Sequence, residues 1–517
     1  TNMGEAQKAV ELLESASAFI ESIGDTVVYH RTLVPKAEAY RQLGDTEKSR
    51  QLLADALQHY EDWRRRQSDP TSAAGLFLRG SDVYGALALV ARDEGKLDEA
   101  WNMCERGRSF VLKERLAPRA FEEPMELAEV QEFLAQANGT LIHYSDPTVG
   151  ALYRFVITPT DIRMDEISSV QPLALEAHNI LDLFAAGESD EICAPGLDRL
   201  GKKLLGGESA PEIFGERVYI VPPSQLEGFP FETLPFDGVP FGEQFAVTYL
   251  PSASTLRMEQ GSPAAGMLAV ADPITDPANL NDGPGEVFRG LRETPLPYAR
   301  AEVDAIKSSE AVVLMGEEAS RANLLGQLEN PFAVLHIATH TLVDPVNPAR
   351  SALVLAQDGS LSAEELEKLS VQCDLVTLSG CQTSGGFTYL GEGVFGLARS
   401  FLLAGAKTVV SSLWDVEDRA ASRFMTLFYE ALRSGEAKDQ ALRTARTAMA
   451  KEGFPHRDRS AFVLAGVGTG TVALGARAQN TFDPNEIFQN PIFAVGVLLT
   501  LLLVAAMAIN AMRGSRR

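Results

Sequence analysis

Short apolar runs alternate with amphipathic stretches over most of this chain, and the alternation predicts a mainly parallel α/β sheet. The predicted strands are 141–144, 151–158, 217–222, 266–273, 311–315, 332–339 and 374–380. The last two, Phe332–Thr339 and Asp374–Gly380, are short, mainly apolar runs with β-branched residues, as is typical of strands buried on both faces. Predicted helices between the strands imply right-handed βαβ units.

The front of the chain, residues 1–118, shows helical periodicity throughout. Two segments echo one another, Ala37–Leu57 and Ala86–Gly107, and each carries a glycine between two amphipathic stretches, Gly44 and Gly95. This arrangement resembles tetratricopeptide helix–turn–helix units. The two glycines lie 51 positions apart (44 to 95), whereas the usual period is about 34, so the repeats are degenerate or their helices are long. A plain helical bundle without a binding groove is the alternative.

Length and charge limit the class of protein. The 517 residues are too many for one core, so two to four domains are expected. The hydrophobic content of 45% is ordinary for a globular protein. A net charge of −24, without a dense basic stripe, argues against direct binding of nucleic acid.

The four cysteines suggest a reducing compartment. They are widely spaced apart from the last two and form no CxxC pair, so the sequence predicts neither a zinc site nor a disulfide framework. Three of them, Cys104, Cys193 and Cys373, are interpreted as small buried hydrophobes. No metal or cofactor is predicted.

A membrane anchor is predicted near the C-terminus. Residues Pro491–Met512 are free of charge, and a helix of this length, rising about 1.5 Å per residue, spans a bilayer core of about 30 Å. The alternative is a buried core helix. Three arginines follow, Arg513, Arg516 and Arg517. Since no signal-like segment precedes the globular part, we expect a single-pass tail anchor with the large domain facing the cytoplasm, although the positive-inside rule favours the opposite orientation.

The candidate chemistry is a histidine and a cysteine, each just after one of the two buried strands. His340 follows Phe332–Thr339, and Cys381 lies at the end of the second run. Reactive groups collect at the carboxyl edge of such sheets, and an imidazole there can generate the thiolate that attacks a carbonyl. A cysteine peptidase is therefore the leading hypothesis. The nearby His336, inside its strand, is interpreted as a hydrogen-bonded core histidine.

Several motifs in order along the chain resemble the CHAT-domain family of caspase-like cysteine peptidases, which commonly follow tetratricopeptide repeats. They are LHIATH (Leu335–His340), VTLSGCQTS (Val376–Ser384), GEGVFGLARSFLLAGAKTVVSSLWDVED (Gly391–Asp418) and SAFVLAGVG (Ser460–Gly468). The resemblance continues upstream in VYIVPPSQLEGFPFETLP (Val218–Pro235) and YLPSAS (Tyr249–Ser254), so it covers roughly residues 138–470.

The resemblance implies a caspase-like three-layer α/β sandwich, preceded by an all-α TPR-like region and followed by the transmembrane helix. The expected domains are a TPR-like region at 1–118, a pseudo-protease-like part of the CHAT domain at 119–260, its catalytic part at 261–470, a linker at 471–490 and the transmembrane helix at 491–512.

The resemblance also implies roles for individual residues. His340 corresponds to the catalytic histidine and Cys381 to the nucleophile. The oxyanion hole is implied to consist of the backbone N–H groups of Cys381 and of Thr341, the residue after the histidine. Glycine usually occupies the second of these positions in the family. A β-branched residue restricts the backbone there and crowds the substrate, which predicts low resting activity.

Substrate preference is predicted from an acidic segment after SSLW. Related separases and gingipains use an acidic pocket for a basic P1 residue, whereas caspases use arginines for Asp. By the family's layout, Asp415, Glu417 and Asp418 border the S1 pocket, where a carboxylate pairs with Lys or Arg. The alternative is that an aspartate caps the following helix, Arg419–Arg433, and capping is the favoured role for Asp418.

The predicted function is a membrane-tethered cysteine endopeptidase regulated through its TPR-like region, with a protein substrate and a regulatory protein as partners. The family suggests a role in bacterial defence or programmed cell death. A catalytically inactive scaffold that only binds proteins is the alternative, followed by an esterase or amidase acting on a small substrate. A nucleotide sensor is disfavoured because the chain has no GxxxxGK[ST] loop.

Overall fold

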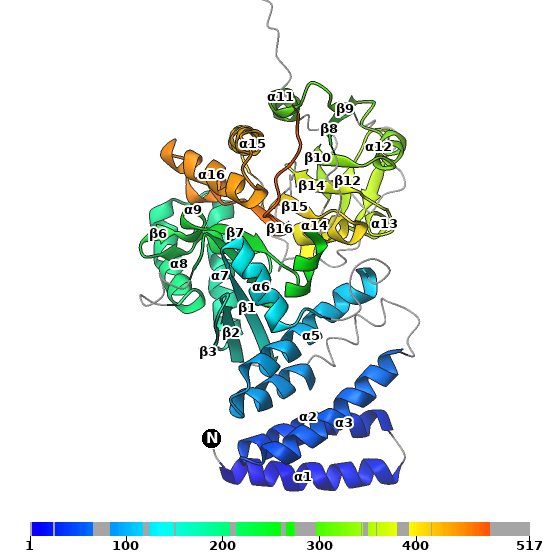
Figure 1. Ribbon diagram of the computed structural model, residues 1–517, viewed down its shortest axis with the longest axis vertical. Coiled ribbons are helices and arrows are strands. Elements are labelled where there is room, and N and C mark those ends of the chain that lie inside the picture. The colour runs from blue at the N-terminus through cyan, green and yellow to red at the C-terminus, as the bar shows by residue number, and fades with distance from the viewer. Residues whose placement is uncertain are drawn as a thin grey trace, which may run out of the picture. The chain divides into compact units, whose positions relative to one another are not determined.

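The computed structural model describes residues 3–475, apart from 24–25, 66–82, 117–123, 149–150, 207–213, 260–264, 275–295, 343, 345–349, 358, 380–391 and 415 (Figure 1). Cys381, Asp415 and the predicted span Pro491–Met512 therefore lie outside the described residues. Among the helices that the structure describes, none is long and apolar enough to cross a membrane.

One sheet of eleven strands forms the centre of the described chain. In sheet order the strands are β3 (Ile162–Ser168), β2 (Ala151–Ile157), β1 (Gly139–Thr148), β4 (Arg217–Val221), β7 (Ala246–Tyr249), β16 (Phe462–Gly466), β15 (Thr408–Ser412), β14 (Cys373–Leu378), β10 (Phe332–Ala338), β8 (Met267–Pro273) and β9 (Val312–Gly316). Seven of the ten strand pairs are parallel, which confirms the predicted sheet type. Four strands, β3, β7, β15 and β16, were not predicted.

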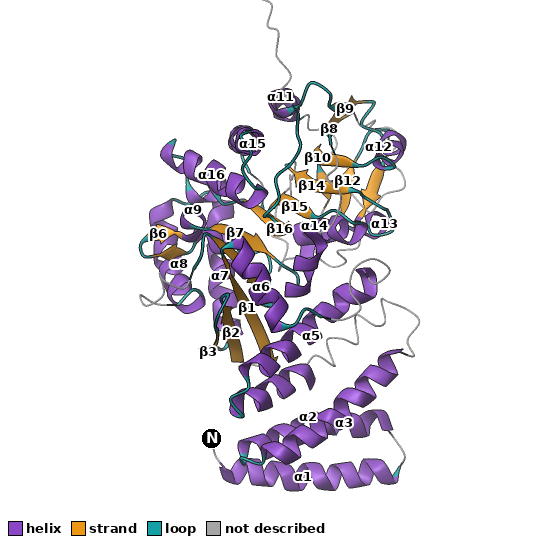
Figure 2. Ribbon diagram, in the orientation of Figure 1, coloured by secondary structure: helices purple, strands orange, loops and turns teal. Residues whose placement is uncertain are grey.

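Helices cover both faces of the sheet (Figure 2). They are α6 (Leu127–Ala137), α7 (Val170–Ala186), α8 (Asp190–Leu204), α9 (Phe241–Gln244), α11 (Pro297–Ile306), α12 (Arg321–Leu328), α13 (Ala363–Leu366), α14 (Glu392–Ala404), α15 (Asp418–Arg433), α16 (Lys438–Lys451) and α17 (His456–Arg459). A short hairpin, β5 (Pro235–Phe236) and β6 (Val239–Pro240), and the 3-10 turns η1 (Ser224–Leu226) and η2 (Phe231–Thr233) form the Pro- and Phe-rich segment after β4.

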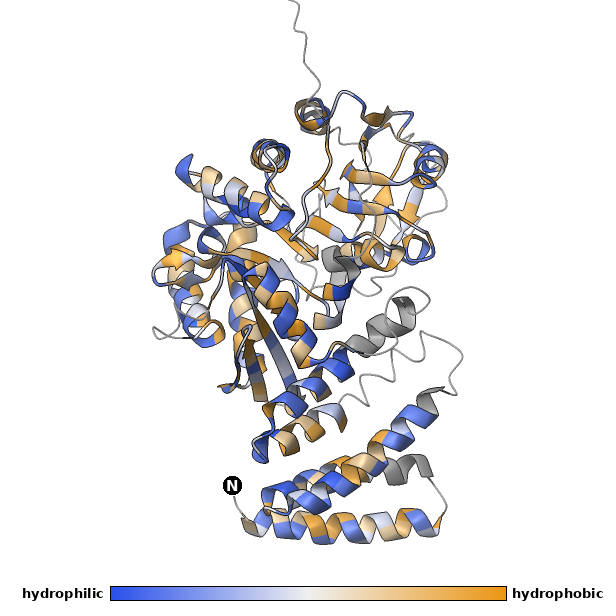
Figure 3. Ribbon diagram, in the orientation of Figure 1, coloured by the Kyte–Doolittle hydropathy of each residue, from blue (hydrophilic) through white to orange (hydrophobic). Residues whose placement is uncertain are grey.

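Alternate residues of the buried strands pack into two separate cores. On β10, Val334 and Ala338 join the cluster that contains α11 and α15 side chains. Leu335 and Ile337 join the cluster that contains side chains of α12, α13 and α14. This is the period-two alternation of a strand that is buried on both faces. The half of the sheet around β10 is thus the middle of three layers, and Figure 3 shows its strands as mostly hydrophobic.

The two halves of the sheet meet at β16. This strand pairs antiparallel with β15 and parallel with β7. Strands β1, β4 and β7 therefore run opposite to β14 and β10. The carboxyl ends of β15, β14, β10, β8 and β9 therefore share one edge of the sheet, beside the amino ends of β16, β7, β4 and β1. His340 follows β10 at that carboxyl edge.

The helical front consists of α1 (Met3–Ser22), α2 (Thr26–Gln42), α3 (Thr46–Arg65), a helix at 83–93 and α5 (Leu97–Leu116). Both predicted turn glycines have positive φ angles, +84° at Gly44 and +77° at Gly95, a conformation that favours glycine. Five positions after each glycine, Ser49 and Ala100 are fully buried. The two predicted helix–turn–helix units are confirmed.

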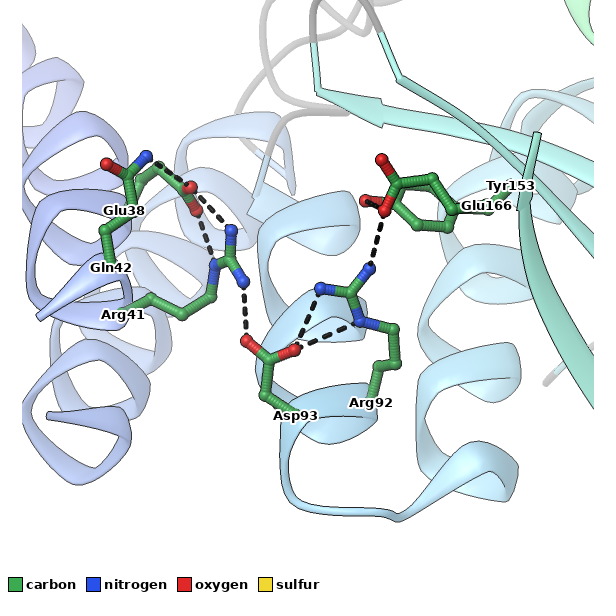
Figure 4. Close-up of polar contacts among 7 residues, drawn as sticks. All are labelled: Glu38, Arg41, Gln42, Arg92, Asp93, Tyr153 and Glu166. Carbon is green, nitrogen blue, oxygen red and sulfur yellow. Dashed lines mark hydrogen bonds and ion pairs between the residues drawn. The ribbon is translucent and has the colours of Figure 1, made fainter. Parts of the chain in front are cut away.

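Charged side chains connect these units to each other and to the sheet (Figure 4). Arg41 of α2 donates to Asp93 at 2.5 Å, across the two helix pairs. The neighbouring Arg92 lies 5.1 Å over the ring of Tyr153 on β2 and 3.6 Å from Glu166 on β3. The last repeat unit is therefore capped by packing on the α/β domain.

A buried carboxyl group also attaches the helical front to the α/β domain, through four hydrogen bonds. Glu105 of α5 is fully buried and accepts hydrogen bonds at the start of η3 (Ala253–Glu259). The donors are the hydroxyl of Ser252 (2.5 Å), the backbone N–H groups of Ala253 (3.1 Å) and Ser254 (2.8 Å), and the hydroxyl of Ser254 (2.6 Å). The YLPSAS motif is thus a docking point for the helical front.

This attachment predicts a pH-dependent stability. Burial raises the pKa of Glu105 above its usual 4.5, although the Ser252 and Ser254 hydrogen bonds act in the opposite direction. A raised folded-state pKa means that the residue's contribution to stability is fully present below the unfolded pKa and is lost as the pH rises through the folded one. The Tm advantage of the wild type over Glu105→Gln should therefore shrink from about pH 4.5 towards neutrality.

The control is Glu365→Gln. Glu365 is partly desolvated, but hydrogen bonds from Ser362 and Arg321 lower its pKa to about 2. Its contribution should stay constant over the same range, because a lowered pKa matters only in more acidic solution. A Tm difference for Glu105→Gln that is flat or grows with pH would contradict the assignment.

Candidate functional site

The site is built on two neighbouring parallel strands, β10 and β14. Ile337 pairs with Leu378, and the N–H of Ser379 donates to the Ile337 carbonyl at 3.0 Å. His340 lies three positions after Ile337, and Cys381 lies three positions after Leu378. The two chain segments therefore leave the same sheet edge in register. The position of Cys381 itself is outside the described residues.

His340 connects β10 to a small antiparallel sheet. That sheet contains β11 (Thr341–Leu342), β12 (Ala352–Val354) and β13 (Ser360–Ser362). The His340 carbonyl accepts a hydrogen bond from the N–H of Val354 at 2.9 Å, and the residue is only 5% exposed. The ladder holds the backbone of the histidine at the carboxyl edge, where the imidazole has little freedom to move away.

The backbone N–H of Thr341 points away from its strand partner. Thr341 pairs with Leu353, and the bond from Val354 N–H to the His340 carbonyl makes this a non-hydrogen-bonded pair of the antiparallel ladder. Its N–H is therefore directed to the open side of β11, which is an edge strand of the small sheet. A backbone oxyanion donor needs an N–H that its own ladder does not use, and Thr341 meets that condition.

The interpretation of His336 as a hydrogen-bonded core histidine is confirmed. The residue is fully buried in β10. Its Nδ1 lies 3.1 Å from the hydroxyl of Tyr429, and its Nε2 lies 3.0 Å from a carboxylate oxygen of Glu302. His336 faces the helix layer of α11 and α15, whereas His340 lies beyond the strand.

The three other cysteines are buried thiols, as predicted. Cys104, Cys193 and Cys373 belong to three different hydrophobic clusters. Burial raises the pKa of all three thiols, to about 12 at Cys104 and Cys373. Their thiolates are disfavoured at neutral pH, so they are poor nucleophiles.

The predicted substrate pocket is only partly described. Asp415 lies outside the described residues, and Asp418 is the first residue of α15. The expectation that Asp418 caps this helix is wrong, because α15 begins one residue earlier than predicted and Glu417 occupies the N-cap position, without a side-chain hydrogen bond. A role for Asp415 and Asp418 in binding a basic P1 residue stays a prediction.

A groove of about 560 Å³ lies between α11, α15 and the segment after α16. Tyr298, Arg419 and Phe454 line it, and Arg423 there is paired with Glu452 at 2.5 Å. Neither His340 nor Thr341 belongs to its lining. The groove is therefore separate from the candidate catalytic edge.

The motif FPFETLP carries a buried charged residue that was not singled out from the sequence. Glu232 accepts a hydrogen bond from the hydroxyl of Tyr249 at 2.5 Å and lies 3.6 Å from the guanidinium of Arg446. Arg446 also donates to the carbonyls of Gly242 (3.2 Å) and Phe462 (3.0 Å). The group joins η2, β7, α9, α16 and β16, so it holds the junction between the two halves of the sheet. The motif therefore holds the fold together at this junction.

Comparison with protein families matches the CHAT domain to residues 190–467. Among curated proteins, human tetratricopeptide repeat protein 28 is 30% identical over 164 residues, and the mouse protein of the same name is 29% identical over 160 residues. The matches cover 31% and 30% of this chain, and the chain spans only 6% of each relative.

Two solved structures share similarity with the fold. The separase of the Saccharomyces cerevisiae separase–securin complex is 12% identical, with a TM-score of 0.44, over 90% of this chain and 45% of that one. The Arg-specific cysteine proteinase gingipain R (RgpB) of Porphyromonas gingivalis is 9% identical, with a TM-score of 0.36, over 55% of this chain and 69% of that one.

The buried Glu232–Arg446 pair predicts a large loss of stability when one partner is removed. Burial raises the pKa of Glu232 and lowers that of Arg446, so each charge depends on the other. Arg446→Met should lower the free energy of unfolding by about 3–5 kcal/mol, because it leaves the carboxylate buried and unpaired. Denaturant unfolding measures the loss.

Adding Glu232→Gln to Arg446→Met should restore part of that stability, since the unpaired charge is then removed. The matched control is Arg423→Met, which breaks the exposed pair with Glu452 and should cost less than about 1 kcal/mol. Equal losses for the buried and the exposed arginine would refute the scaffold role.

Proposed function

The chain belongs to the CHAT-domain family, and on that premise we propose that it is a caspase-like cysteine endopeptidase. Cys381 is the nucleophile and His340 is the general base. The observation that carries the proposal is the in-register parallel pairing of β10 with β14, which brings the segments that lead to both residues to one sheet edge. The three buried cysteines leave Cys381 as the candidate thiol.

The proposed reaction is acyl transfer in two steps. The imidazole of His340 takes the proton of the Cys381 thiol, and the thiolate attacks the scissile carbonyl carbon. The resulting oxyanion is stabilised by the N–H groups of Thr341 and Cys381. The tetrahedral intermediate collapses as His340 returns the proton to the leaving amine, which forms a thioester. Water, deprotonated by His340, then releases the acid and restores the thiol.

The helical front is proposed to regulate this activity. Glu105 attaches α5 to η3, and η3 directly follows β7 in the central sheet. A regulatory protein that binds the repeat helices would therefore act on an element anchored to the same sheet as the site. The similarity to tetratricopeptide repeat proteins supports a protein as the partner.

A membrane location is a further part of the proposal. It rests on the uncharged segment Pro491–Met512, which we propose anchors the domain with its site facing the cytoplasm. A role in bacterial defence or programmed cell death is proposed from the family alone.

The decisive test measures the cleavage of fluorogenic peptides that differ only at P1. Three proteins are compared: the wild type, Cys381→Ala and Cys193→Ala. The wild type should cleave best after Arg or Lys, because carboxylates of the Asp415–Asp418 segment pair with a basic side chain. Cys381→Ala should lose all cleavage, whereas Cys193→Ala, at a buried position, should keep it. If the wild type cuts nothing while partner binding persists, the chain is an inactive scaffold. Better cleavage after an uncharged P1 residue would remove the acidic-pocket hypothesis alone.

The oxyanion donor can be tested at Thr341. Thr341→Pro removes the N–H but spares the ladder, because proline is tolerated on an edge strand where the N–H faces outward. We expect kcat to fall about a hundredfold to a thousandfold with little change in Tm. Thr341→Ala keeps the N–H and should retain activity within about threefold. Equal kcat values for the two variants would exclude this donor.

A further inference from the structure

A chain of polar side chains lies at the end of β14, in the helix-covered layer of the sheet. His336 on β10 and Thr377 on β14 are direct register partners. The hydroxyl of Tyr429 on α15 donates to the hydroxyl of Thr377 at 3.1 Å and lies 3.1 Å from Nδ1 of His336. The second ring nitrogen, Nε2, lies 3.4 Å from the hydroxyl of Ser379 and 3.0 Å from the Glu302 carboxylate.

This polar group interrupts an otherwise apolar layer. The β10 and β14 residues on the same face, Val334, Ala338 and Leu375, belong to the hydrophobic cluster. Glu302 is only 4% exposed and His336 is fully buried. Removing a carboxylate and an imidazole from water is unfavourable, and apolar residues of similar size are often at least as stable. A gain in stability alone therefore does not explain why these polar side chains are buried here. A role in fixing one arrangement of the strand end does explain it.

The contacts converge on the end of β14. Thr377 and Ser379 flank Leu378, the last residue of that strand, and Ser379 is the final described residue before Cys381. Ser379 is held twice, by its N–H to the Ile337 carbonyl and by its hydroxyl at the His336 ring. Burial raises the pKa of Tyr429, so its hydroxyl keeps the hydrogen that it donates to Thr377.

We propose that Glu302, His336 and Tyr429 are positioning residues that act through Ser379 on the nucleophile Cys381. The carboxylate of Glu302 on α11 lies beside the His336 ring, and the ring with Tyr429 fixes the end of β14, three positions before Cys381 in the sequence. This inference rests on the proposed peptidase function. It deepens that function, because it assigns the geometry of the nucleophile to a buried group that does not contact substrate.

The test compares two buried tyrosines that each lose one hydroxyl. Tyr429→Phe removes a contact of the proposed group, whereas Tyr144→Phe removes an equally buried hydroxyl that donates to the Leu204 carbonyl at 2.7 Å, in the other half of the sheet. Both variants should shift Tm by a similar amount. Only Tyr429→Phe should lower kcat, by about tenfold with KM within about twofold, because a small misplacement of a reacting group costs rate more than binding.

A second readout does not require peptidase activity. The alkylation rate of Cys381 by iodoacetamide, followed by peptide mass spectrometry as a function of pH, reports how well the thiolate is stabilised. Tyr429→Phe and Ser379→Ala should move the midpoint of this profile to higher pH, whereas Tyr144→Phe should leave it in place. Glu302→Leu should behave like Tyr429→Phe, and Glu302→Gln, which still carries an amide oxygen for the ring, should restore most of the wild-type profile.

The outcomes separate this inference from the peptidase proposal. If Tyr429→Phe and Ser379→Ala match Tyr144→Phe in both kcat and the alkylation profile, the positioning role is overturned. If the wild type cleaves no peptide, the peptidase proposal fails and the alkylation profiles alone decide whether the buried group controls the thiol. Should Glu302→Leu fail to fold, the two hydroxyl variants remain sufficient.

Discussion

The in-register parallel pairing of β10 with β14 is the constraint on which the candidate site depends. Parallel strands end at the same edge, so residues at equal offsets beyond a paired position leave the sheet together. His340 and Cys381 have equal offsets from the Ile337–Leu378 pair. A shift of one residue in this register would offset the two chain segments that lead to His340 and Cys381, the proposed base and nucleophile.

The rest of the molecule supports that edge through buried charged groups. Glu232 and Arg446 join the halves of the sheet where β7 meets β16, and Glu105 attaches the repeat helices to η3. Glu302 and His336 lie under the strand ends themselves. Each group is unfavourable to bury unless its partner is present, so each stabilises one arrangement of the elements it connects.

The sequence-based predictions that the structure confirms are those with the strongest patterns in the local sequence. Short, mainly apolar runs identified β10 and β14, and Gly44 and Gly95 identified the repeat turns, where positive φ angles require glycine. Strand β7 was missed because it has only four residues, too few to show a periodicity of its own. The N-cap of α15 was misplaced by one residue, since Glu417, Asp418 and the preceding Asp415 are similar in local sequence.

By itself the sequence determined the class of the fold, the helical repeats, and His340 with Cys381 as the candidate chemistry, because these depend on periodicity and on motifs within a few residues. Only the tertiary structure decided that the Thr341 N–H faces the open side of β11 and that His336 joins Glu302 to Tyr429. Tyr429 is 93 positions from His336, and no local pattern encodes a contact over that separation. Such pairings are set when helices pack on a sheet whose strand order differs from the order of the chain.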